Sequence, residues 1–199
     1  MRRLGRWVAG GSAGNEQLTA MVACVLLVLL AVEGATLLNL DLFLNVHAFV
    51  GMLLLPIVGL KLASTGWRFV RYYGHAEEYV HRGPPHVVLR VLVAPVIVVS
   101  TIFLFGTGVV LLAHDQTSGT IVGLHKASFI VWVGATSLHV LAHLLRLSNL
   151  LDERLPGLAA RVAVVGASVA AGVAVAMLTL PAADHLQDRL TGVVRIDGR

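Results

Sequence analysis

Five apolar segments, each long enough to cross a lipid bilayer as a helix, dominate the sequence. The hydrocarbon core of a bilayer is about 30 Å thick, so a spanning helix needs about 20 apolar residues. Helices suit this setting because every backbone polar group finds its partner within the same segment. The expected spans are about 18–40, 42–64, 87–113, 120–145 and 159–180. The sequence therefore predicts an all-α integral membrane bundle of five transmembrane helices.

The composition excludes two other classes of protein. Hydrophobic residues make up 57% of the chain and charged residues 13%, whereas soluble domains carry about 25% charged residues. A soluble globular domain is therefore excluded. A disordered chain is excluded too, because the burial of so many apolar side chains gains more free energy than the ordering of the chain costs. The single cysteine, Cys24, allows neither an internal disulfide nor a multi-cysteine metal site. We expect residues 1–180 to form one bundle and the polar residues 181–199 to form a flexible tail.

The distribution of basic residues predicts the orientation in the membrane. The connections at Asp41 and at 114–119 contain no lysine or arginine. Positive charge is retained on the cytoplasmic side during insertion, so we expect the N-terminus inside, the C-terminus outside, and a multi-pass protein of a bacterial inner or plasma membrane. The net charge of +4 is then a consequence of topology, and no nucleic-acid partner is expected. The arginines assigned to the cytoplasmic side are Arg2, Arg3, Arg6, Arg68, Arg71, Arg82, Arg146, Arg154 and Arg161.

Two segments outside the core spans have their own expectations. The connection 67–86 mixes Trp, Tyr and Arg as interfacial segments do, which favours a membrane-surface anchor over a dedicated binding site. The first apolar segment is longer than the apolar part of a cleaved signal peptide and lacks a small-residue cleavage site, so we expect it to remain a transmembrane helix.

Histidine is the unusual residue type, with nine in a chain that otherwise avoids ionisable groups. An ionisable side chain inside a membrane is costly and points to a functional site. His47 and His125 each lie about five residues into their helices from the outer face, so a rise of about 1.5 Å per residue places them at one depth. The two imidazoles are therefore predicted to approach one atom between the helices.

A second pair of histidines follows on the same helix as His125. His139 is fourteen residues further on, a rise of about 21 Å and a rotation about 40° short of four full turns. His125 and His139 therefore share one helix face at two depths, as two haems stacked across a membrane require. His143 lies on that face again, about 27 Å from His125, so His139 is the better buried candidate.

Small and basic residues near the histidines suit a flat macrocycle with acidic substituents. Glycines let a porphyrin approach the backbone, although they equally allow close helix packing. Lys126 and Arg90 are candidates for pairing with haem propionates. Alternatively, Lys126 extends to the headgroups and Arg90 belongs to the cytoplasmic basic set. The glycines concerned are Gly51, Gly106, Gly108 and Gly134.

Several alternatives to a haem protein stay open at this point. Each histidine can hydrogen-bond a neighbouring helix and fix packing, in bonds that average about 0.6 kcal/mol in membranes. Imidazoles also bind zinc or copper, and Glu33 with a histidine can relay protons. The alternative function is therefore a non-redox membrane scaffold or a histidine-based metal transporter.

The placement of His47, His125 and His139 resembles that in the bacterial membrane b-type cytochromes. These include the cytochrome b subunits of formate dehydrogenases and nickel-iron hydrogenases. The resemblance covers about residues 18–145 and rests on spacing and depth. It implies a four-helix cytochrome b-like core with two b haems, in which the fourth core helix supplies one ligand to each.

The resemblance implies roles for individual residues and fails at one position. His47 and His125 would be the axial ligands of an outer-leaflet haem, and His139 one ligand of an inner-leaflet haem. The family often supplies the other inner ligand from the start of the first helix or from the second, where this sequence has no histidine; residues 15–17 are Asn-Glu-Gln. His86 is the substitute, so one haem b is predicted and a second is left open.

The expected function is electron transfer within a larger oxidoreductase. Two axial imidazoles leave the haem iron no open coordination position, so such a haem transfers electrons. No flavin or nicotinamide motif is present, so the chain is expected to be a subunit that works with a redox partner and a quinone in the bilayer. His143, His86 and Arg90 are the candidates for the quinone site.

Overall fold

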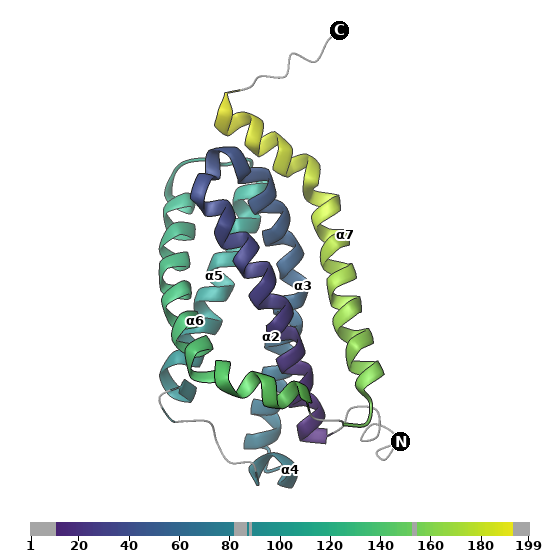
Figure 1. The fold of residues 1–199 in the computed structure, drawn as a ribbon. Coiled ribbons are helices and arrows are strands. Elements are labelled where there is room, and N and C mark those ends of the chain that lie inside the picture. Colours follow the sequence, from purple (N-terminus) through teal and green to yellow (C-terminus); the bar gives the residue numbers. More distant parts are fainter. Residues whose placement is uncertain (1–10, 82–86, 88, 153–154, 193–199) are drawn as a thin grey trace.

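The computed structural model describes the backbone of residues 11–81, 87, 89–152 and 155–192, with the side chains of 89–90 and 144–152 left out. Every element of this part of the chain is helical, which confirms the all-α prediction (Figure 1). Three short elements are η1 (Leu37–Asn39), α4 (Glu77–Val80) and the π-helix η2 (Leu89–Val93). The long helices are α2 (Gly11–Thr36), α3 (Leu40–Tyr73), α5 (Ala94–Ala113), α6 (Thr120–Asp152) and α7 (Leu158–Thr191).

Four helical stretches are long and apolar enough to cross a membrane: Gly11–Tyr73, Val91–Ala113, Thr120–His143 and Leu158–Thr191. The first comprises α2, η1 and α3, and the chain reverses direction within it (Figure 1). The reversal occurs at Asn39, whose φ of −150° and ψ of 80° are not helical. Asn39 Oδ1 also accepts a hydrogen bond of 3.3 Å from the backbone N–H of Leu42 and so caps α3.

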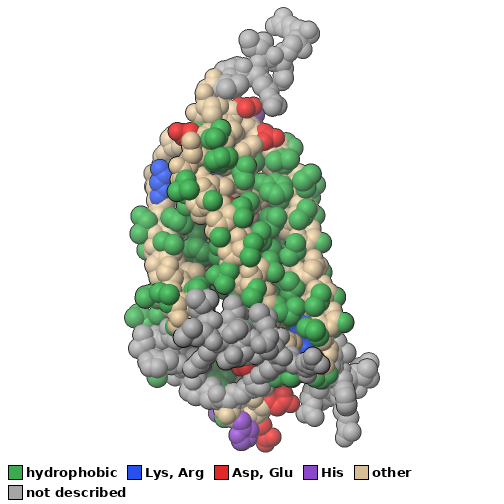
Figure 2. Space-filling view, viewed as in Figure 1, with side chains coloured by type: hydrophobic (Ala, Val, Ile, Leu, Met, Phe, Trp, Pro, Cys, Tyr) green, Lys and Arg blue, Asp and Glu red, His purple; other side chains and the backbone are tan. Residues whose placement is uncertain are grey.

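The surface of the bundle fits a lipid environment. Figure 2 shows hydrophobic side chains along the middle of the molecule, with acidic side chains near both ends. Large apolar side chains are far more exposed than water would favour, with Leu38 88% and Leu178 82% accessible. Lipid tails are as apolar as these side chains, so their exposure carries no penalty in a bilayer.

The tightest packing is between α3 and α7, which lie side by side (Figure 1). Val22 of α2, Leu54 and Ile57 of α3, and Ala176 of α7 form a fully buried core. A Cβ added at Gly172 would lie 2.3 Å from the backbone oxygen of Leu53, so the two helices touch at backbone distance. Close contact through small residues is the usual way in which membrane helices associate.

The expectation of a flexible tail from residue 181 is wrong for residues 181–191, because α7 continues through Pro181 to Thr191. Ala183 and Leu186 are buried against apolar side chains of α3 and α5. Polar bonds fix the same segment: Asn45 Nδ2 donates to Asp184 Oδ1 at 3.2 Å, and the backbone N–H of Asn45 donates to Gln187 Oε1 at 3.1 Å. Residues 193–199 lie outside the described residues.

Other helices are also longer than the apolar spans suggested. α2 begins at Gly11 and α3 ends at Tyr73, so part of the expected connection 67–86 is helical. Polar pairing stabilises these extensions, as shown by the 3.0 Å ion pair between Arg68 and Glu16. The guanidinium carbon of Arg71 lies 5.7 Å from the centre of the Trp67 ring, an aromatic and basic combination suited to the membrane surface.

Candidate functional site

His47 of α3 and His125 of α6 meet near the end of the bundle where α2 leads into α3. Their ring centroids are 6.4 Å apart and their ring planes are perpendicular. The structure thus brings together the two residues that the depth argument paired. Their roles toward a cofactor depend on which ring nitrogens are free, which their hydrogen bonds decide.

The Nδ1 atom of His47 faces two oxygen atoms of α2. It lies 3.0 Å from Glu33 Oε1 and 3.1 Å from Thr36 Oγ1. The Thr36 hydroxyl also donates to the backbone oxygen of Glu33 at 2.6 Å. An ionised carboxylate only accepts hydrogen bonds, so Nδ1 of His47 carries the proton, and in the neutral ring the lone pair is on Nε2.

The Nδ1 atom of His125 is bonded in the same manner to α5. It lies 3.1 Å from the backbone oxygen of Leu104 and 3.1 Å from Thr107 Oγ1. The Thr107 hydroxyl donates to the backbone oxygen of Phe103 at 2.6 Å. A carbonyl oxygen only accepts, so His125 is also protonated at Nδ1 and has its lone pair on Nε2.

The ring separation and the bonded Nδ1 atoms suit two imidazoles that bind one metal atom through Nε2. An imidazole that binds a metal through one nitrogen usually donates its other N–H to a carboxylate or a backbone carbonyl, and His47 and His125 do so. With metal–nitrogen bonds of about 2.0–2.1 Å, the centroids of two such rings stand about 6 Å apart. The observed 6.4 Å agrees with this separation.

The four glycines named in the sequence analysis have different surroundings in the structure. A Cβ at Gly108 would lie 3.2 Å from Cε1 of His125, so this glycine does provide space for the ring. Gly51 instead faces Glu33, with its added Cβ 3.6 Å from Oε1. Added Cβ atoms at Gly106 and Gly134 would meet nothing within 4 Å. At Gly108 of α5 the absence of a side chain thus leaves room for the imidazole of His125.

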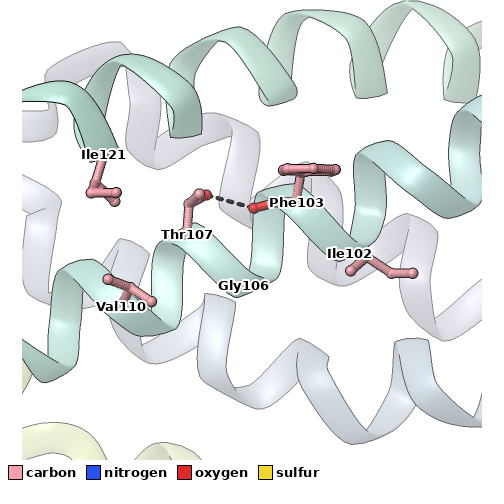
Figure 3. A pocket seen from close by; sticks show the side chains of 6 residues that line it. All are labelled: Ile102, Phe103, Gly106, Thr107, Val110 and Ile121. Carbon is pink, nitrogen blue, oxygen red and sulfur yellow. Dashed lines mark hydrogen bonds between the residues drawn. The ribbon is translucent and has the colours of Figure 1, made fainter.

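An apolar hollow of about 200 Å³ opens between α5 and α6 (Figure 3). Thr107 is its polar member, and the same hydroxyl contacts His125. The hollow is lined by Ile102, Phe103, Gly106, Thr107, Val110 and Ile121.

The two histidines further along α6 are arranged differently. His139 and His143 stack on each other along α6, with centroids 4.5 Å apart and an angle of 26° between the rings. Nδ1 of His143 donates to the backbone oxygen of His139 at 2.9 Å. Within the described part of the chain, no histidine of another helix contacts either ring. His86 and the side chain of Arg90 lie outside the described residues.

The two lysines of the apolar segments lie at different ends of the bundle. Lys126 is exposed beside His125. Lys61 is directed toward α2, where its ammonium group donates to the backbone oxygen of Thr19 at 2.8 Å. The neighbouring Ser64 accepts a bond of 3.0 Å at its backbone oxygen from Asn15 Nδ2. Sequence reasoning did not identify this polar contact between α2 and α3.

Sequence reasoning also missed most partners of the histidine pair. It named Glu33 only for proton relay with a histidine, and it did not name Thr36, Leu104 or Thr107. The role of Thr36 could have been predicted, because residues three apart share one face of a helix and Thr36 follows Glu33 by three positions. The carbonyl of Leu104 has no sequence signal, because every residue carries one.

Comparisons with protein-family models, with curated proteins and with solved structures give no match to this chain. Among the described residues, no group of three or more His, Cys, Asp or Glu side chains is placed to hold a metal ion. Function is therefore argued from the geometry and chemistry of the histidine pair.

Proposed function

We propose that this chain is an integral membrane b-type cytochrome that holds a haem between His47 and His125. It carries electrons between a quinone in the bilayer and a redox partner subunit. The observation that supports this most strongly is the 6.4 Å separation of two imidazoles whose Nδ1 atoms are both already hydrogen-bonded. Each ring thus keeps the lone pair of Nε2 for a further ligand.

A haem needs less from the protein than a bare metal ion does. In a haem the porphyrin would supply four nitrogens to the iron, and the imidazoles of His47 and His125 would complete its coordination. A bare zinc ion instead takes three or four protein ligands. Two histidines from facing helices are therefore sufficient for a haem, and this favours the cytochrome over the histidine-based metal transporter.

The side chains of the pair have defined tasks in this proposal. A haem bound by two imidazoles supplies a one-electron couple without an open coordination position. His47 and His125 position the group, while Glu33 and the Leu104 carbonyl fix their tautomers. The apolar helices around the pair keep water away, so the protein controls the reduction potential through burial and hydrogen bonds.

The proposal includes five crossings of the membrane. α2 and α3 run antiparallel, as contacts join both ends of the pair: Asn15 with Ser64 at one end, and Thr36 with His47 at the other. With α5, α6 and α7 continuing the alternation, Gly11 and Thr191 lie at opposite ends (Figure 1). The arginine distribution then assigns the Gly11 end to the cytoplasm and the histidine pair to the outer leaflet.

One haem per chain is proposed for the described structure. A second haem on His139 requires a ligand from another helix, and His86 is the residue available for it. The quinone is proposed to bind near the cytoplasmic end, where His143 lies and where the sequence places His86 and Arg90.

Haem content of single variants tests the assignment. His47→Ala and His125→Ala are each expected to lose the haem, as measured by the pyridine haemochrome assay on purified protein. His185→Ala is the matched control, because His185 is an exposed histidine near the end of α7 and pairs with Asp115. This variant is expected to leave the haem content unchanged. Full haem retention in both of the first two variants would refute the assigned pair.

A further inference from the structure

We propose that Glu33 is a positioning residue for the haem: its carboxylate holds the Nδ1 proton of His47 and thereby lowers the reduction potential. The inference rests on the proposed function. It adds a residue outside the ligand set that tunes the electron-transfer property of the site.

The first support is the placement of Glu33 in the last turn of α2, directly after the apolar run 20–32. Oε1 lies 3.0 Å from Nδ1 of His47, and the Glu33 side chain is 16% exposed. Oε2 is buried, and the described residues provide it with no hydrogen-bond partner. A carboxylate inside a membrane is costly and is expected to have a functional role, with its partner identifying that role. Here the partner is His47.

The second support is the difference between the two ligands. His47 bonds to an acidic side chain, whereas His125 bonds to the neutral carbonyl of Leu104. Hydrogen bonds to an ionised acceptor are roughly twice as strong as those between neutral groups. The carboxylate therefore makes the His47 imidazole the more electron-donating ligand. A more basic ligand favours the oxidised, more positively charged iron, which lowers the potential.

Thr36 adds to the positioning. Its hydroxyl donates to the backbone oxygen of Glu33, so its remaining lone pairs face Nδ1 of His47. The N–H of His47 is thus held between two oxygens from one turn of α2. The ring orientation is determined by α2, although His47 itself belongs to α3.

The test is a potentiometric titration of the haem in Glu33→Gln and in the unsubstituted protein. Glutamine keeps the size and one oxygen acceptor but removes the charge. We expect the site to bind the oxidised haem about tenfold more weakly, relative to the reduced haem, than in the unsubstituted protein. This is the low end of the 10–100-fold losses that are typical when such a hydrogen-bond partner is replaced. It raises the reduction potential by about 59 mV. Glu16→Gln is the control, since Glu16 lies at the other end of α2, where it pairs with Arg68. The reduction potential of the haem in this variant is expected to be unchanged.

The outcomes separate the two proposals. Absence of haem from the unsubstituted protein refutes the proposed function. A haem whose potential is the same in Glu33→Gln refutes the role of Glu33 and leaves the function standing. If Glu33→Gln does not fold, Glu33→Asp is titrated instead: the shortened carboxylate is expected to raise the potential by less than 59 mV, and no change overturns the inference.

Discussion

Replacement of Gly172 by alanine tests the contact that fixes α7 against α3. The added Cβ would lie 2.3 Å from the backbone oxygen of Leu53, well inside any real contact distance. The obstacle is backbone, so no side chain can rotate away, and the two helices must separate. Overpacking of this kind costs about 1–3 kcal/mol, and a backbone obstacle favours the upper end of that range. We therefore expect Gly172→Ala to destabilise the protein by about 3 kcal/mol.

Gly166→Ala is the matched control on the same helix. An added Cβ at Gly166 meets nothing within 4 Å, and alanine is the better helix former by about 0.5–1 kcal/mol. Thermal unfolding in detergent, followed by circular dichroism, is expected to show a lower Tm for Gly172→Ala and an unchanged or higher Tm for Gly166→Ala. Equal Tm values for the two variants would refute the backbone contact between α3 and α7.

Three further variants test other parts of the structure. Gln187→Ala removes the hydrogen bonds of this side chain with the backbone of Asn45 and Asp41. Each bond contributes about 0.5–1.5 kcal/mol, so their loss is expected to speed proteolysis within 182–191. An unchanged cleavage rate would contradict the docking of this segment. Gly108→Ala places a Cβ 3.2 Å from Cε1 of His125 and is expected to lower the haem occupancy. Gly106→Ala is the control, because its Cβ meets nothing within 4 Å, and it is expected to retain the haem. Equal haem content in the two variants would argue against a tight fit at Gly108. His139→Ala is expected to leave one haem per chain, and loss of the haem in this variant would place the site at His139 instead of at the pair of His47 and His125.

The sequence predicted the helices and the meeting of His47 with His125 for simple physical reasons. Helical rise converts residue number into depth, and His47 and His125 each lie about five residues from the start of the expected spans 42–64 and 120–145. The rotation of a helix about its own axis cannot be predicted from residue number in this way. Whether Glu33 faces His47 depends on how α2 packs against α3, which long-range contacts such as that of Asn15 with Ser64 determine.

The helix ends were predicted less well, because polarity was taken to end a helix. α7 continues past Pro181 since Leu186 is buried and Gln187 is bonded to the start of α3. Likewise, α3 extends to Tyr73 beyond the apolar span, and Arg68 in that extension pairs with Glu16. Such tertiary contacts join residues far apart in sequence, so no local pattern reveals them.

The central claim is that two histidines from facing helices hold a haem. The most direct measurement is the visible absorption spectrum of the purified protein, from cells supplied with haem, before and after reduction with dithionite. The account predicts a Soret band that shifts on reduction, the sharp visible bands of a low-spin b haem in the reduced form, and about one haem per chain by the pyridine haemochrome assay. A colourless protein with no Soret band would contradict it.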